Sequence, residues 1–404
     1  MSSVRGVPSW AVVARDLYLV AMAVFVVNIV IGILNGSDAV EFDRNQILTH
    51  VHAGTIGWMT LTIIASTFLL FRNADRRLML ALAVLVPIYV VAFYTGSRPF
   101  RAIAGTLLLI AIAWVLVWMW RQFLASERSL PQLAVILGLT SFGYGAVVGV
   151  LLQLQFAVGI TLLSGDGIGA HAAAMTFGYL VLVAMGFLEW RLLGTRGLPR
   201  GGLVQVLALF IGGLVISLGL LAGAAQAAGG LYLLLQLVAV VLFVRRIWPT
   251  SLRISWLAAT PLRHFAAASI WVVGALILFM YLVSKFVTGA DPNDPNAFPL
   301  NVLIASDHSV YIGVITNIVL GLLSLLVLSE ADRRSWIGHL IFWGVNLGLV
   351  VFVIGLIVDT AELKRIGAPV MGVTLLVALA ILAMRAWRAS LTDAEAEADL
   401  GATG

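Results

Sequence analysis

Two histidines, one residue apart, open one of the long apolar stretches of this chain. His50 and His52 stand in the run THVHAGTIGW (residues 49–58), and His171 and His308 open apolar stretches further on. Neutral imidazole is a good ligand for heme iron and for copper. A polar ring at the mouth of a membrane helix is costly unless something binds it. The pattern therefore predicts a metal cofactor held within the membrane, heme before any other.

The spacing of the pair predicts two sites. On a helix, residues two apart point ~200° apart, so His50 and His52 cannot readily bind one iron and would face opposite sides of their helix. Small neighbours such as Ala53 and Gly57 leave room for a flat macrocycle. The competing interpretation is a histidine hydrogen-bonded to a carbonyl at the membrane interface. That interpretation is favoured for the remaining two histidines, His264 and His339, which would snorkel at the inner interface.

The composition requires elements that cross a membrane. The 404 residues are 61% hydrophobic and 11% charged, whereas a soluble domain carries about 25% charged residues. A spanning helix needs ~20 mostly apolar residues. The chain therefore predicts an all-α polytopic membrane protein, a single integral membrane domain over residues 1–404, in contact with the lipid bilayer and not with nucleic acid. The twelve predicted helices are 17–36, 47–71, 78–96, 102–120, 132–154, 168–190, 201–224, 227–245, 264–287, 306–328, 337–358 and 367–387.

Charge in the loops orients these helices. Arginines gather in alternate loops, and the other loops are mainly acidic or neutral. By the positive-inside rule both termini are cytoplasmic in a bacterial-type plasma membrane, and segments 2, 6 and 10 run inward. This orientation puts the four histidines that open those segments in one layer near the outer face. The chain has no cysteine, which excludes disulfides, thiolate-ligated heme and iron–sulfur clusters.

Other polar residues lie beside the predicted layer. Arg98 and Arg101 break the charge rule in a short outer loop, and their guanidinium groups suit the carboxylates of heme propionates. Lipid headgroup contact is the alternative. Asp307 is interpreted as a helix N-cap, where an acid is favoured, with orientation of an imidazole as the alternative. Tyr311 is interpreted as a member of the interfacial aromatic belt, with supply of a proton near a metal as the alternative.

Three stretches carry a family resemblance. HVHAGTIGW (residues 50–58) resembles the HxHxGxxGW stretch of catalytic subunits of C-type heme-copper oxidases, and is similar to the HxHxxxxG stretch of the NnrS family of heme- and copper-containing membrane proteins. DHSVYIG (residues 307–313) is similar to a later histidine-containing helix of the NnrS family. GHLIFWGVNL (residues 338–347) resembles the eleventh helix of heme-copper oxidase subunits. The resemblance implies a divergent member of the heme-copper oxidase subunit I superfamily, with twelve helices in three four-helix arcs.

The chain departs from that pattern in two places. In the oxidases the HxH pair lies on helix 10, whereas here it lies on segment 2. The threefold pseudosymmetry implied by the resemblance allows a cyclic shift, in which His52 pairs with His171 around a low-spin heme and His50 holds a second heme or metal facing His308. The alternative pairs a segment 2 histidine directly with His308. Segment 7 (201–224) has no histidine, so a complete copper site of the oxidase kind is disfavoured.

Three functions follow. The first is a protein that binds one or two hemes of type b, as a respiratory-type oxidoreductase in electron transfer or in nitric oxide or oxygen handling. Because the chain has no CxxCH, such heme is held noncovalently, and electrons would come from quinol or from a partner cytochrome. The second is a transporter with a histidine metal-ion or proton site. The third is a non-catalytic sensor or assembly subunit that keeps the fold.

Overall fold

The structure, a computed structural model, describes residues 9–289 and 299–401. In these residues every regular element is helical, and twelve helices are long and apolar enough to cross a membrane. The all-α polytopic prediction is thereby confirmed. The spans are Trp10–Gly36, Arg44–Phe71, Arg76–Tyr94, Arg98–Ala125, Leu130–Val158, Gly167–Leu193, Arg200–Leu221, Ala225–Ser251, Leu262–Val287, Leu300–Val327, Trp336–Ile357 and Ala361–Arg388.

Eight spans are one helix each, and four are built from several elements. The single helices are α1, α4, α5, α6, α9, α10, α11 and α17, in chain order. Span 2 joins α2 (Arg44–His52), η1 (Ala53–Thr60) and α3 (Leu61–Phe71). Span 6 joins α7 (Gly167–Met175), η2 (Thr176–Leu180), α8 (Val181–Leu188) and η3 (Glu189–Leu193). Span 10 joins α12 (Leu300–His308), η4 (Ser309–Thr316) and α13 (Asn317–Val327); span 11 joins α15 (Trp336–His339), η5 (Leu340–Gly344) and α16 (Val345–Ile357).

The predicted ranges each overlap one span, but three helices begin six or seven residues earlier than predicted. Span 1 begins at Trp10, span 10 at Leu300 and span 12 at Ala361. In spans 1 and 12 the added turns carry charges, at which a hydropathy window stops, whereas a helix continues where those charges find partners. In span 1, Arg15 donates to Asp16 and to the carbonyl of Ala389, so the charged turn stays helical. Two short helices outside the predicted ranges, α14 (Glu330–Arg334) and α18 (Asp393–Gly401), complete the described chain.

Three spans form the centre of the bundle. In spans 2, 6 and 10, 83%, 83% and 89% of the most apolar window is buried, against 33–67% in the other nine spans of the described chain. The remaining helices pack around them in the order α1, α4, α5, α6, α9, α10 and α11 on one side and α1, α17 and α16 on the other, and a hydrogen bond from Trp271 to Asn346 joins α11 to α16. Spans 3–5 therefore close the space between spans 2 and 6, and spans 7–9 close the space between spans 6 and 10.

Each central span changes from α to π geometry shortly after its histidine. The π-helical segments η1, η2 and η4 touch one another, and three side-chain hydrogen bonds join them. Trp58 Nε1 donates to Thr316 Oγ1 over 2.9 Å, Tyr179 Oη donates to Thr60 Oγ1 over 3.3 Å, and the Tyr311 and Thr176 hydroxyls are 3.3 Å apart. π-Helical turns are rare and occur mostly at functional sites. The three histidine-bearing helices are thus tied into one unit.

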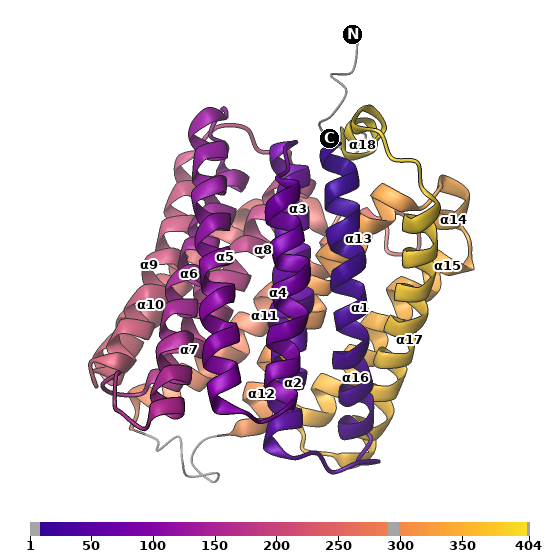
Figure 1. The fold of residues 1–404 in the computed structure, drawn as a ribbon. Coiled ribbons are helices and arrows are strands. Elements are labelled where there is room, and N and C mark those ends of the chain that lie inside the picture. Colours follow the sequence, from indigo (N-terminus) through magenta and orange to yellow (C-terminus); the bar gives the residue numbers. More distant parts are fainter. Residues whose placement is uncertain (1–8, 290–298, 402–404) are drawn as a thin grey trace.

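The histidine-bearing helices share one end of the bundle. α2, α7 and α12 lie at the end opposite to the two termini and to α18 (Figure 1). This arrangement follows from the chain itself, because three spans lie between spans 2 and 6 and three between spans 6 and 10, so all three run in the same direction. The end that carries the termini is called the termini end below.

Candidate functional site

His50 faces α1. Its Nδ1 lies 2.9 Å from the backbone oxygen of Asn28, and the Asn28 amide donates back to the backbone oxygen of His50 over 2.5 Å. Gly32, one turn further along α1, leaves room for the ring, since a Cβ there would lie 3.0 Å from His50 Cε1. The ring is therefore held in a fitted recess on the α1 side of span 2.

His52 faces the other way, toward α4. Its Nδ1 lies 2.8 Å from the backbone oxygen of Leu48. Its ring stacks on Phe93 at 3.7 Å between centroids, and meets Tyr89 edge-on at 5.8 Å. The two histidines of the pair thus project to opposite sides of span 2, in the manner that helical spacing dictates.

His171 and His308 have equivalent surroundings on the other central spans. His171 Nδ1 lies 2.8 Å from the backbone oxygen of Gly145, and a Cβ at Gly149 would come within 2.7 Å of His171 Cε1. His308 Nδ1 lies 2.9 Å from the backbone oxygen of Ile304, and its ring packs against Phe352 at 5.0 Å. Each ring is positioned by a carbonyl and by a neighbouring glycine or aromatic residue.

One hydrogen-bonding geometry is common to these four, which we call the site histidines: His50, His52, His171 and His308. In each, Nδ1 faces a backbone carbonyl, so Nδ1 carries the proton and donates it. Nε2 of all four makes no hydrogen bond to any residue in the ranges 9–289 and 299–401. An imidazole whose Nδ1–H is fixed on a carbonyl presents the Nε2 lone pair, which is the arrangement of a metal-ligating histidine.

The site histidines fall into two sets of neighbours. His50 and His308 stand just before η1 and η4, which touch each other. Between spans 2 and 6, His52 and His171 line a large cavity of about 660 Å³. Cofactor sites are mostly apolar cavities of ~300–1,000 Å³. The walls near this pair are apolar or small, and include Gly105, Phe142 and Gly149.

Arg101 lies beside the His52 side of that cavity, and Arg98 does not. The Arg101 side chain is 7% exposed; Nη2 donates to Asn45 Oδ1 and to the backbone oxygen of Phe93, over 2.8 and 2.7 Å. Its guanidinium carbon is 4.6 Å from the centre of the Phe93 ring, on which His52 also stacks. Arg98 is exposed at the surface with one long contact to the oxygen of Phe156. Of the two predicted arginines, Arg101 alone is built into the surroundings of a site histidine.

Two expectations about span 10 are wrong. Asp307 does not cap a helix, because α12 begins at Leu300 and Asp307 lies in its last turn, in the wall of the large cavity. Tyr311 does not belong to an interfacial belt, since it lines the same cavity and its hydroxyl meets Thr176. Both errors have one cause. The predicted segment began at 306, so residues within the span were assigned to its mouth.

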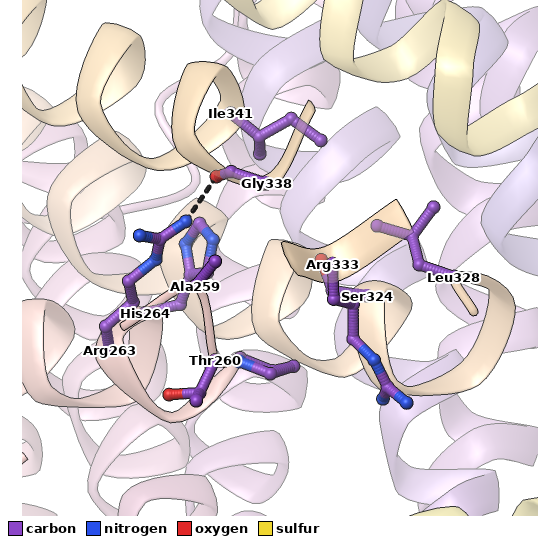
Figure 2. Close-up of a pocket in the computed structure, with 10 residues that line it drawn as sticks. Ala259, Thr260, Arg263, His264, Ser324, Leu328, Arg333, Gly338 and Ile341 are labelled. Atoms are coloured by element: carbon purple, nitrogen blue, oxygen red, sulfur yellow. Dashed lines mark hydrogen bonds between the residues drawn. The ribbon is translucent and has the colours of Figure 1, made fainter. Parts of the chain in front are cut away.

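The prediction for His264 is also wrong. His264 does not snorkel; it is 3% exposed, and its Nδ1 lies 3.0 Å from Asn317 Oδ1. It lines a small cavity of about 10 Å³ near the termini end, beside Arg263, which donates to the backbone oxygen of Gly338 (Figure 2). His339, half-buried, lies with Nδ1 3.3 Å from Arg263 Nη1. A volume of this size holds about one water molecule and no cofactor.

Several residues of the site do not stand out in the sequence. Asn28 anchors His50 through its backbone oxygen, which faces Nδ1, and through its amide nitrogen, which lies 2.5 Å from the backbone oxygen of His50 and 3.1 Å from Nδ1. Phe93 stacks on His52, and Gly32 and Gly149 make room for imidazole rings. Asn28 carried a usable signal, because it is a lone amide inside the apolar run of segment 1, and a polar residue within a spanning helix is costly without a partner. The glycines and Phe93 carried none, since glycine and phenylalanine are common in spanning helices.

The described residues contain no group of three or more histidine, aspartate or glutamate side chains that could hold a metal ion. A metal bound by one of the pairs would therefore need ligands from outside the protein, as the four nitrogens of a porphyrin supply. Comparison with protein-family models gives no match, and comparison with curated proteins gives none either.

Proposed function

We propose that this protein binds heme b noncovalently in the membrane, between His52 and His171, and a second heme between His50 and His308. The observation that carries the proposal is the shared geometry of the site histidines, with Nδ1 fixed on a carbonyl and Nε2 without a hydrogen bond in the described chain, together with the one cavity that His52 and His171 both line. Two Nε2 atoms on one iron complete six-coordination with the four porphyrin nitrogens, so two donors per site suffice. This pairing is the one that the cyclic shift of the HxH motif predicts.

The residues around His52 and His171 fit such a group. The large cavity offers an apolar volume and glycines at closest approach, which favour a flat hydrophobic ring. Nε and Nη2 of Arg101 hold the side chain in place by hydrogen bonds. Arg101 Nη1 makes no hydrogen bond within the described chain, so it could donate one to an anionic propionate. When bound, heme supplies a one-electron carrier and, where its iron keeps an open position, a ligand site for a diatomic gas.

The two pairs support different tasks. Iron ligated by both His52 and His171 has no open position, so we assign electron transfer to that site. The His50–His308 site has Asn28 donating its amide beside one histidine, and it would handle nitric oxide or oxygen if one of its histidines releases the iron. The site histidines are proposed to lie toward the outer face of a bacterial-type plasma membrane, with quinol or a cytochrome as the electron donor. Copper has no part in the proposal.

The test is an absorption spectrum of the protein purified after expression with added heme precursor, together with iron and heme b per protein. We expect a Soret band, low-spin bands on reduction, and two hemes per chain. Carbon monoxide added to the reduced protein should shift the spectrum of the second heme alone.

A protein prepared in this way that lacks a Soret band would refute the heme proposal. In that case metal-dependent uptake into vesicles would decide for the transporter, whose histidine site would then bind a metal ion with water as the remaining ligands.

A further inference from the structure

A second part of the large cavity is lined by residues of α9, α10, α11 and span 10, none of them a histidine. We call it the acidic half, because its polar groups include two carboxylates. The residues that line it are Asp166, Ile216, Leu220, Ala225, Phe279, Leu282, Val283, Leu300, Leu303, Asp307 and Tyr311, with Thr176 and Phe177 from span 6.

The Asp307 carboxyl group is unpaired in this wall. No hydrogen bond or ion pair joins it to any residue of the described chain, and neither lysine nor arginine lines any part of the cavity. An ionised carboxylate in apolar surroundings is costly unless a positive charge or hydrogen-bond donors compensate it. Asp166 lies exposed at the outer rim of the same half, where its backbone nitrogen bonds to the oxygen of Leu220.

Aromatic rings line the same part of the cavity as Asp307. Tyr311 follows one turn later, and Phe279 stacks on Phe177 at 3.3 Å between centroids. The faces of such rings attract organic cations. The part of the wall formed by Leu300 and Ile168 is exposed and apolar, so a ligand would enter from an apolar environment.

Behind Phe279 lie two buried polar atoms without partners. Tyr232, whose ring meets Phe279 edge-on at 5.7 Å, leaves its hydroxyl without a hydrogen bond, and Gln236 one turn along α10 leaves Oε1 without one, within the described residues. Both side chains are 1% exposed. Neither residue is among those that line the cavity, so these unpartnered atoms belong to the core behind Phe279.

From these observations we propose that the acidic half is a binding site for a lipid-soluble organic cation, an amine on an apolar body, whose ammonium group pairs with Asp307. The charge of the wall decides the class of ligand. Two carboxylates and no basic residue of the lysine or arginine type repel an anion, which also means that the propionates of a heme are disfavoured here and favoured near Arg101. The proposal goes beyond the heme function and does not depend on it.

The test uses three probes with one apolar body and different head groups: 4-hexylbenzylamine, 4-hexylphenol and 4-hexylbenzoate. Radiolabelled 4-hexylbenzylamine is titrated into heme-free and heme-loaded protein in phosphatidylcholine nanodiscs, with empty nanodiscs subtracted. We expect saturable binding of one amine per chain in both preparations. The phenol should compete about tenfold more weakly, because it offers a hydrogen bond without a full charge, and the benzoate should not compete.

Amino-acid substitutions locate the part of the cavity in which 4-hexylbenzylamine binds. Asp307→Asn keeps the shape and removes the charge, and we expect it to weaken amine binding about tenfold and to leave the phenol within about twofold. Asp307→Glu should retain the amine, and Asp359→Asn, an acid that does not line the cavity, should change nothing. His171→Leu should leave amine binding intact, since it alters the other half.

Competition by the benzoate equal to that by the amine in the wild-type protein would overturn the proposal without any variant. So would unchanged amine binding in a folded Asp307→Asn protein, or its loss in His171→Leu alone. Failure of the heme proposal looks different, because it is an absent Soret band with amine binding intact.

Discussion

The histidines at the two ends of this bundle are the same residue type in opposite circumstances. The site histidines hold Nδ1 on backbone carbonyls and present Nε2, and two of them line a cavity of about 660 Å³. His264, near the termini end, has its Nδ1 hydrogen-bonded to Asn317 and lies beside a cavity of about 10 Å³. The two groups differ in the acceptor of the Nδ1 hydrogen bond, a backbone carbonyl against a side-chain amide, and in the volume of the neighbouring cavity. A histidine suited to bind a metal is recognised by an Nε2 that has no hydrogen-bond partner and faces open space.

The polar network around His264 completes the contrast. The amides of Asn317 and Asn346 bond to each other in both directions at 3.0 Å, and Trp271 Nε1 donates to Asn346 Oδ1 over 3.1 Å. These four side chains join α11, α13 and α16 and satisfy one another. Such a network binds helices together in lipid, where interhelical hydrogen bonds replace the hydrophobic drive.

The largest effect is expected from removing a ligand on the cavity side. His171→Ala should abolish the low-spin heme signal and lower heme b by one per chain, because iron loses one of its two protein ligands. His52→Ala should act alike. Reduced-minus-oxidised spectra and heme content measure this. His339→Ala, near the termini end, is the matched control and should retain full heme. An equal loss of heme in His339→Ala would contradict the proposed difference between the histidines at the two ends.

The second pair should be separable from the first. His308→Ala is expected to remove the carbon monoxide-sensitive heme and leave the low-spin signal of the His52–His171 site unchanged, since the two pairs lie on different faces of span 2. Carbon monoxide difference spectra with heme counts give the answer. Loss of both signals in this variant would favour direct pairing of a span 2 histidine with His308 instead.

A smaller effect is expected from filling the recess beside His171. Gly149→Ala adds a Cβ at 2.7 Å from His171 Cε1, so the ring must move and the iron bond weakens. We expect heme affinity at that site to fall about tenfold, as for residues that orient a ligand. Gly230→Ala, in open space on α10, is the control for helix propensity and should leave affinity unchanged. Heme transfer to apomyoglobin measures both, and equal affinities would contradict the tight recess.

The smallest change should come from the opposite network. Asn317→Leu leaves His264 Nδ1 without its partner and removes both hydrogen bonds between Asn317 and Asn346, and we expect a loss of about 1–2 kcal/mol in the free energy of unfolding. Heme content should stay at the wild-type value. Asn301→Leu, the same substitution on the same span but at an exposed amide, should cost less than about 0.5 kcal/mol. Unfolding in a mixed detergent series compares them, and heme loss in Asn317→Leu would link the network to the site.

The sequence by itself determined the class of protein and the number of spans. Runs of ~20 apolar residues cannot be accommodated otherwise, and the opposite directions of His50 and His52 follow from helical spacing alone. It misplaced the starts of spans 1 and 12 where charged residues found partners, as Arg15 does with Asp16, and it also began span 10 too late. The shift at the start of span 10 then assigned Asp307 and Tyr311 to the interface instead of to the cavity wall.

Only the tertiary structure decided which histidines face each other and which atom each presents. That choice depends on groups far away in sequence, such as Asn28 for His50 and Gly145 for His171. It also gave one end of the bundle a large cavity and the other a satisfied network. A sequence window records hydrophobicity and period, but a hydrogen-bond acceptor becomes a neighbour only when helices pack, so the chemistry of these histidines is a property of the fold.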